Sequence, residues 1–234
     1  MLQKNQDDFY TFSSFLKFPE LICATSTRKQ GNLKGKVNFS DFKKFIKKLG
    51  HNFNFVQFEQ VHGSKVVRVE GKMTNKILPN CDGGVTKEKK LLLAVFVADC
   101  FPILVYDQVK KIVGVAHAGW RGVKAKIAKN LISQMQTLGS NPYDMVVGIG
   151  PGICGKCYEV GRDVASQFDQ GFLTRRDGRI LLDLEKAIIE QLVQKSIKRK
   201  NVGTSGICTF ENGNFFSARR EGETGRIAAV IGTR

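Results

Sequence analysis

Three apolar runs between residues 91 and 116 constrain the fold of this chain more than any other feature of its sequence. Leu91 to Val97 is almost continuously apolar, and two further runs follow at Ile103 to Asp107 and Ile112 to Ala116. Runs this short, bounded by polar residues, are typical of strands buried on both faces of a sheet. A tight connection between the second and third runs would bring Cys100 and His117 to neighbouring strand ends. We therefore expect a thiol and an imidazole to share one pocket.

The rest of the chain alternates between strand and helix patterns. Apolar residues recur at helical spacing in residues 40–50, 123–139 and 183–200, with Ser40 and Asp183 placed to cap the first and last of these helices, and another helix is expected to begin near Val160. Strands are expected at residues 21–27, 53–58, 66–69, 144–149, 206–209, 215–220 and 227–231, and a turn at Cys81 to Val85. This pattern predicts a mixed α/β (α+β) fold, and no linker or repeat divides residues 1–234, so we expect a single domain.

Composition narrows the classes of function. The formal charge of the 234-residue chain is +16, which favours anionic partners, but no nucleic-acid-binding module is recognisable. We therefore expect small anionic substrates rather than nucleic acid. No apolar run is long enough for a signal peptide or a membrane span, which predicts a cytoplasmic protein with no membrane partner. In that setting the six cysteines are expected to be free thiols, ligands or nucleophiles rather than a disulfide framework.

The chain has three histidines, and this scarcity limits the possible metal sites. His51 follows a predicted helix among polar residues, whereas His62 precedes Gly63 at a bend between two strands. His62, Cys100 and His117 therefore form the most economical set of ligands. Three protein ligands with one open position describe a catalytic zinc site, in which the metal acidifies a bound water or polarises a substrate oxygen.

Two other chemistries remain open for the same residues. Cys100 and His117 could act as nucleophile and base of a thiol hydrolase or amidase, with Asp99 or a backbone carbonyl orienting the imidazole. Two histidines and a cysteine also resemble a blue-copper site, but a multicopper oxidase needs many more imidazoles than this chain has, so copper is disfavoured. Cys154 and Cys157 form an isolated CxxC, which we interpret as incidental loop thiols.

Six short motifs together resemble the YfiH family. They are Gln60-Val61-His62-Gly63, Cys81-Asp82-Gly83, Ala98-Asp99-Cys100, His117-Ala118-Gly119-Trp120-Arg121-Gly122, Cys157-Tyr158-Glu159-Val160-Gly161 and Thr224-Gly225-Arg226. Proteins of that family carry the labels laccase domain, polyphenol oxidase and purine nucleoside phosphorylase. The resemblance implies a mixed sheet core flanked by helices and a zinc ion held by the residues matching His62, Cys100 and His117.

The resemblance also implies an activity. Family members cleave purine nucleosides such as adenosine, inosine and methylthioadenosine with phosphate, giving the base and ribose 1-phosphate, and they deaminate adenosine. A role in editing peptidoglycan precursors is an alternative, and the oligomeric state stays open. The residues implied to line the pocket are Arg28, Asn38, Gln60, Arg121 and Arg220. Among these, Arg28 and Arg121 suit the phosphate, while Asp99 is the carboxylate expected to serve deamination.

Overall fold

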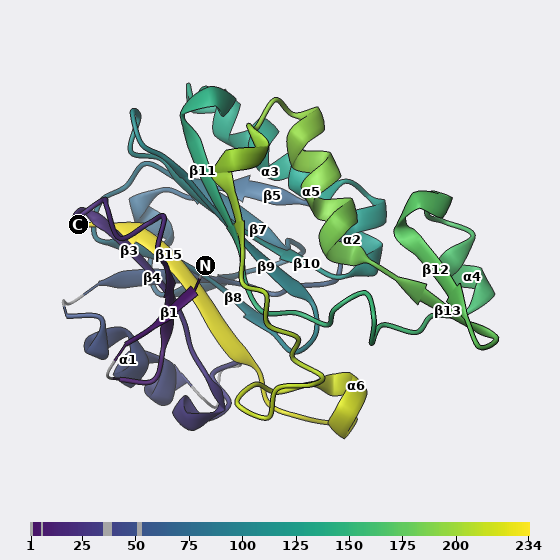
Figure 1. The fold of residues 1–234 in the computed structure, drawn as a ribbon. Coiled ribbons are helices and arrows are strands. Elements are labelled where there is room, and N and C mark those ends of the chain that lie inside the picture. The colour runs from purple at the N-terminus through teal and green to yellow at the C-terminus, as the bar shows by residue number, and fades with distance from the viewer. Residues whose placement is uncertain (1, 6, 35–38, 51–52) are drawn as a thin grey trace.

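Two large mixed sheets packed face to face form the centre of the structure (Figure 1). The computed structural model describes residues 2–5, 7–34, 39–50 and 53–234. Over these residues the first sheet has the order β1 (Leu2–Lys4), β2 (Tyr10–Phe12), β3 (Leu21–Thr25), β15 (Ile227–Thr233), β8 (Leu91–Val97), β4 (Asn54–Phe58) and β6 (Lys76–Leu78). The second has the order β14 (Val202–Thr204), β11 (Met145–Ile149), β9 (Phe101–Asp107), β10 (Val113–Ala118), β7 (Gly83–Thr86) and β5 (Val66–Arg68).

Strand β8 shows why the apolar run at residues 91–97 is continuous. Successive side chains of a strand point to opposite faces of the sheet, so one set must pack on each side. Leu91, Leu93 and Val95 pack into the core between the two sheets, where they belong to the same cluster as Leu104 and Val115 of the second sheet. The alternate residues of β8 pack on the outer side of the first sheet. The strand is buried on both faces, as expected.

Helices cover the two outer faces of this pair of sheets (Figure 1). Helix α1 (Phe39–Lys48) lies on the first sheet and buries Phe42, Phe45 and Ile46 against it. Helices α3 (Ile127–Thr137) and α5 (Leu184–Gln194) cover the second sheet with their apolar faces. The resulting order of layers is helix, sheet, sheet, helix, which confirms the mixed α/β fold class.

Shorter elements complete the described chain. They are α2 (Trp120–Lys124), α4 (Arg162–Ala165), α6 (Ala218–Glu221), the hairpin of β12 (Leu173–Arg176) and β13 (Arg179–Leu182), and 3-10 turns at Arg28–Gln30, Gly71–Met73, Pro142–Asp144, Gln170–Phe172 and Arg199–Asn201. None of the helices in the described ranges is both long and apolar enough to cross a membrane.

Five local expectations were wrong. The helix expected over 123–139 is broken, because Lys126 adopts a left-handed backbone (φ 66°) between α2 and α3. The expected turn at Cys81 to Val85 contains the start of strand β7. Residues 206–209 make an isolated bridge between Cys208 and Gly152 rather than a regular strand, and residues 215–220 run into α6. Position 40 lies inside α1, so Ser40 does not cap that helix.

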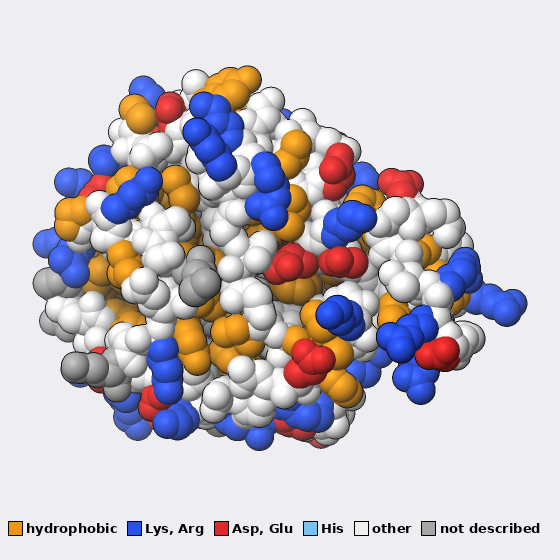
Figure 2. Space-filling model, viewed as in Figure 1, with side chains coloured by type: hydrophobic (Ala, Val, Ile, Leu, Met, Phe, Trp, Pro, Cys, Tyr) orange, Lys and Arg blue, Asp and Glu red, His pale blue; other side chains and the backbone are white. Residues whose placement is uncertain are grey.

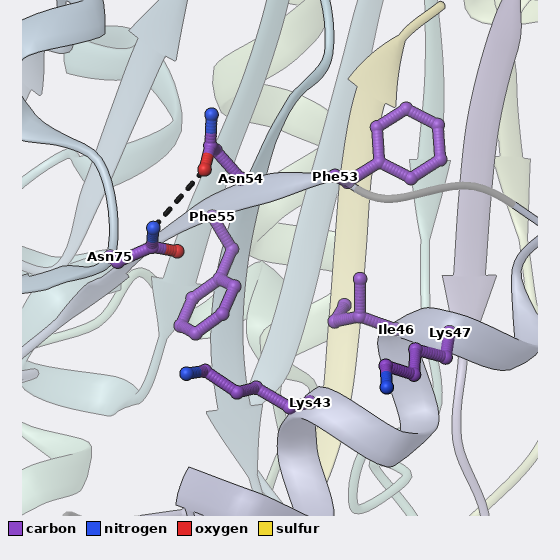
Figure 3. Close-up of a pocket in the computed structure, with 7 residues that line it drawn as sticks. All are labelled: Lys43, Ile46, Lys47, Phe53, Asn54, Phe55 and Asn75. Atoms are coloured by element: carbon purple, nitrogen blue, oxygen red, sulfur yellow. Dashed lines mark hydrogen bonds between the residues drawn. The ribbon is translucent and has the colours of Figure 1, made fainter.

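A hollow of about 220 Å³ lies between α1 and strand β4, with Asn75, which precedes β6, on its edge (Figure 3). Figure 3 shows Phe55 and Ile46 on its walls and a hydrogen bond of 3.1 Å between the side chains of Asn75 and Asn54. Among the described residues that line it, none carries an imidazole, a thiol or a carboxylate. Its charged lining groups are Lys43 and Lys47, so among the described residues the hollow has no set of side chains suited to holding a metal ion.

Candidate functional site

His62, Cys100 and His117 come together at one end of the second sheet. Each offers a ligand atom, and the three atoms lie within 4.8 Å of one another. The antiparallel register of β9 and β10 pairs Pro102 with His117 and Phe101 with Ala118, which places Cys100, directly before β9, beside the end of β10. His62 lies on the bend after β4, with its ring centroid 4.9 Å from that of His117. The proximity of Cys100 and His117 therefore follows from strand pairing, while His62 arrives from the other sheet.

Two glycines of the string at residues 117–122 make this approach possible. A Cβ on Gly119 would lie 2.9 Å from the sulfur of Cys100 and 3.3 Å from Cδ2 of His62. A Cβ on Gly122 would lie 2.7 Å from the carbonyl oxygen of Gly63. Any side chain at these positions would push the ligand-bearing segments apart, so the glycines are required by close packing.

Asp82 holds both histidines in place. Its Oδ1 lies 2.9 Å from Nδ1 of His117, and its Oδ2 accepts a hydrogen bond of 2.8 Å from the backbone N–H of Gly63, beside His62. Its carbonyl oxygen accepts a further bond of 2.7 Å from the backbone N–H of His117. Metal-binding histidines commonly have such a carboxylate partner on the second ring nitrogen, which leaves Nε2 for the metal. Sequence reasoning missed this role, although Asp82 stands in a quoted motif and is a carboxylate next to two glycines at a strand start.

Cys100 and His117 each stabilise the charged form of the other. Burial raises the pKa of the Cys100 thiol, but His117 and His62 outweigh burial and bring that pKa down to about 6. Burial lowers the pKa of His117, but the Cys100 thiolate and the Asp82 carboxylate outweigh it and raise that pKa to about 9. Without a metal, the two residues therefore form a thiolate–imidazolium pair near neutral pH. The thiolate is the form that binds metals and attacks electrophiles.

A cavity of about 350 Å³ opens beside these three residues. Three cationic side chains and two aromatic rings lie on its walls, namely Lys34, Arg219, Arg226, Phe96 and Tyr158. The guanidinium of Arg219 lies 5.2 Å from the ring centre of Tyr158, and burial raises the pKa of Tyr158 to about 12, so its hydroxyl stays protonated at neutral pH. The cavity thus combines positive charge with flat apolar surfaces.

Asp99 and Gln60, both expected at the site, line this cavity, but their polar groups form hydrogen bonds with the surrounding protein. Asp99 accepts hydrogen bonds of 2.7 Å from the Thr209 hydroxyl and 2.7 Å from the backbone N–H of Arg219, one on each carboxylate oxygen. The amide of Gln60 bonds to both the N–H and the C=O of Phe96, at 2.9 and 2.7 Å. Both side chains therefore brace the walls of the cavity.

The structure does not bring the other expected residues to the cavity lining. Arg28 pairs with Glu221 and stacks over the ring of Phe216, 4.8 Å from its centre. Arg220 donates hydrogen bonds of 2.6 to 2.8 Å to three carbonyl oxygens, those of Thr209, Phe210 and Phe215. Arg121 is exposed, with its guanidinium 4.4 Å from the ring centre of Trp120. Asn38 lies outside the described residues.

The basic residues that do line the cavity were not singled out from the sequence. Arg219 precedes the expected Arg220 by one position, and Arg226 ends the quoted Thr224-Gly225-Arg226 motif. A Cβ on Gly225 would lie 2.7 Å from the Phe216 ring, so this glycine lets the chain pass close to the ring before Arg226. Membership of a motif was the only sequence signal for Arg226. The only signal for Lys34 was its place in a loop rich in glycine and lysine that could carry ligand-binding groups.

Comparisons with known proteins show which family this chain belongs to. Residues 30–234 match the family described as multi-copper polyphenol oxidoreductase laccase. The purine nucleoside phosphorylase of Deinococcus radiodurans is 38% identical over 184 residues, covering 76% of this chain and 70% of that protein. Adenosine deaminase RL5, from an unknown prokaryotic organism, is 34% identical over 154 residues, covering 62% and 59%. The crystal structure of the Bacillus licheniformis hypothetical protein YfiH matches with a TM-score of 0.91 and 26% identity, covering 100% and 99% of the two chains.

Proposed function

This chain belongs to the YfiH family, described as multi-copper polyphenol oxidoreductase laccase, and we propose that it cleaves purine nucleosides with phosphate. The observation that carries the proposal is the set of His62, Cys100 and His117 opening onto a cavity with three cationic side chains. A relative that is 38% identical is named purine nucleoside phosphorylase, which fits an anion-binding cavity of this kind. The products would be the free base and ribose 1-phosphate.

The donor set fits zinc. One thiolate and two imidazoles, with Asp82 fixing the ring of His117, are the ligands of a catalytic zinc site with an open position. A multicopper oxidase would need imidazoles that a chain with three histidines lacks, so we propose zinc rather than copper. When bound, the ion would supply Lewis-acid polarisation of a substrate oxygen.

Different side chains on the cavity walls would bind the phosphate and the purine base. Arg219, Arg226 and Lys34 would hold the phosphate as its oxygen bonds to the anomeric carbon of the ribose. The bond from that carbon to the purine nitrogen breaks, and the base leaves with the electron pair. Phe96 and Tyr158 offer flat surfaces for the base, and the Tyr158 hydroxyl is a hydrogen-bond donor at neutral pH.

Deamination of adenosine is a second activity of the same site in our proposal, because one relative is named adenosine deaminase. That reaction needs a carboxylate to move protons. Among the described residues that line the cavity, Asp99 is the only carboxylate, and both of its oxygens already accept hydrogen bonds. We therefore expect phosphorolysis to be the faster reaction.

The proposal is tested by zinc analysis together with assays of adenosine, inosine and methylthioadenosine with and without phosphate. Cys100→Ala should lower the zinc content by about one ion per chain and abolish phosphorolysis. A metal-independent amidase activity that is lost in Cys100→Ala would instead favour the alternative in which the Cys100–His117 pair is a nucleophile and its base. Full zinc content in this variant would contradict the metal assignment.

Arg226→Ala tests the phosphate site. Loss of one charge-assisted contact to a bound anion should cost about 1.5–3 kcal/mol, or roughly ten- to hundred-fold in phosphate-limited rate, with zinc retained. Arg176→Ala, on the exposed strand β12, is the matched control. If Arg28→Ala showed the larger loss, the assignment implied by family resemblance would replace ours.

A further inference from the structure

Four potential metal ligands come together outside the catalytic cavity, on two loops that are far apart in the sequence. They are Cys154, Cys157, Cys208 and Glu211, whose ligand atoms all lie within 4.8 Å of one another. We propose that these residues bind a second, structural zinc ion. This proposal is independent of the proposed function, because none of the four belongs to the set of His62, Cys100 and His117.

The spacing of the ligand atoms suits a tetrahedral site. With zinc–sulfur bonds of about 2.3 Å, neighbouring ligand atoms of a tetrahedron are about 3.8 Å apart. The four atoms lie within 4.8 Å of one another, so shifts of about an ångström would close the shell. Three thiolates favour zinc over hard cations, and four protein ligands leave no open position. The expected role is therefore structural.

The backbone around these ligands is already organised. Gly152 and Cys208 form a parallel bridge, which joins the loop after β11 to the loop after β14. The N–H of Cys154 points to the sulfur of Cys208 at 3.3 Å, and such N–H···S contacts stabilise thiolates. The N–H of Cys157 donates to the carbonyl of Cys154 at 3.0 Å, which turns the two CxxC thiols towards the same side. The loops thus need little rearrangement to bind the ion.

The charges nearby are compatible with a dication. Binding would release the thiol protons, and three thiolates with one carboxylate carry an excess of negative charge over Zn²⁺. Lys156 lies between the two CxxC cysteines and lines the adjacent hollow of about 470 Å³, where its ammonium can offset part of that excess. Asp183 and Glu185 line the same hollow and would attract a cation to it.

A metal at this position would fix one wall of the catalytic cavity. Ile153 and Tyr158, which line the cavity, lie directly beside Cys154 and Cys157 in the chain. The N–H of Ile153 donates to the carbonyl of Asp99 at 2.8 Å, and the hydroxyl of Thr209, next to Cys208, donates to the Asp99 carboxylate. Loss of the ion should therefore loosen this wall and raise KM more than it lowers kcat.

Zinc content per chain tests the proposal. We expect about two ions per chain in the parent protein and about one in the double variant Cys154→Ser/Cys157→Ser, with a lower Tm. Cys23→Ala, which removes a buried thiol of β3, is the control and should keep both ions. Cys100→Ala should also lose one ion, and combining it with the double variant should leave none. An unchanged zinc content in Cys154→Ser/Cys157→Ser would overturn the proposal, whatever Cys100→Ala does.

A labelling experiment on the parent protein does not depend on whether the variants fold. Iodoacetamide should modify Cys154, Cys157 and Cys208 slowly until a chelator removes the metal, as located by peptide mapping. Rapid labelling of the three thiols before chelation would overturn the proposal. A loss of two hydrogen atoms in the mass of the freshly purified protein, mapped to two of these cysteines, would show a disulfide in place of the zinc site and would overturn it as well.

Discussion

Asp82 is fully buried and contacts both histidine-bearing segments of the proposed zinc site. Its two carboxylate oxygens have different hydrogen-bond partners. Oδ1 pairs with Nδ1 of the His117 ring, and Oδ2 accepts a hydrogen bond from the backbone N–H of Gly63. A buried carboxylate is stable in such a place only when its partners compensate for lost hydration. Burial raises the pKa of Asp82, but the hydrogen bonds from His117 and Gly63 outweigh burial and hold it below its usual range. The residue is therefore an anion that orients ligands.

Asp82→Asn should weaken zinc binding at the catalytic site roughly 10- to 100-fold. The amide carries no negative charge, and its NH₂ group would face either the His117 ring N–H or the Gly63 N–H, neither of which can accept a hydrogen bond from it. The affinity is best measured by competition with a chromophoric chelator in the Cys154→Ser/Cys157→Ser background, so that one site is titrated. Asp41→Asn, an exposed substitution on α1, is the control. Equal affinities for Asp82→Asn and the control would show that the carboxylate does not act on the metal.

Helix α5 has a side-chain cap at its N-terminus. Asp183 precedes the helix, and its carboxylate accepts a hydrogen bond of 2.9 Å from the N–H of Lys186, one of the donors that a helix N-terminus leaves unpaired. The same side chain packs against Gly155, where a Cβ would lie 2.8 Å from the Cβ of Asp183. The cap of α5 and the loop of the proposed second zinc site are thus in contact.

Asp183→Ala should lower the free energy of unfolding by about 1 kcal/mol, because the N–H of Lys186 loses its acceptor. Asp183→Asn is the matched control, since the amide oxygen can still accept that bond. Urea unfolding of both variants measures the difference. A loss of the same size in Asp183→Asn would mean that charge, and not capping, is responsible.

Glu20 links the two large sheets through hydrogen bonds of its side chain. It lies directly before β3 of the first sheet, and its carboxylate accepts hydrogen bonds from the Tyr106 hydroxyl of β9 in the second sheet at 2.6 Å and from Lys111 at 2.5 Å. The bonds from Lys111 and Tyr106 lower the pKa of Glu20 from 4.5 to about 2. A carboxyl whose pKa is depressed in the folded state stabilises it above the unfolded pKa, and this stabilisation is lost as the pH falls through the folded pKa.

The Tm difference between the parent and Glu20→Gln should consequently be present at pH 6 and shrink between about pH 4.5 and pH 2. Because Glu20 is partly exposed, the difference at pH 6 is expected to be small and to fall further in high salt. Thermal unfolding across this pH range, with Glu211→Gln as a control in zinc-free protein, checks the prediction. A difference independent of pH would assign the effect to packing.

The net charge of +16 reflects 37 Lys and Arg residues against 21 Asp and Glu residues. On the face drawn in Figure 2, Lys and Arg side chains are scattered, and Asp and Glu side chains lie among them. A protein that tracks a nucleic-acid backbone usually gathers its positive charge in one stripe or groove. The dispersed pattern on this face fits the expectation of small anionic substrates.

The elements that could be predicted from the sequence are those marked by a pattern of neighbouring residues. The continuous apolar run of β8, the strand of β9, the helical spacing of α1 and α5 and the Asp183 cap were all readable, because each depends on the periodicity of a few neighbouring residues. The scarcity of histidine also singled out His62, Cys100 and His117, because few combinations were available. That Cys100 and His117 lie close together was a prediction from strand order, and the register of β9 and β10 accounts for it.

The folded chain was needed to distinguish the polar groups that line the site from those that stabilise the fold. Arg220 and Arg226 look alike in sequence, yet they are placed differently. Arg220 donates to three carbonyl oxygens away from the cavity, whereas Arg226 donates from Nη1 to the carbonyl oxygens of Thr224 and Gly225 and still lines the cavity. Asp82, rather than Asp99, reaches His117, and Cys208 joins Cys154 across 54 positions of the chain. The physical reason is the same in each case: a side chain's partner is set by the packing of distant segments, and local periodicity carries no information about that distance.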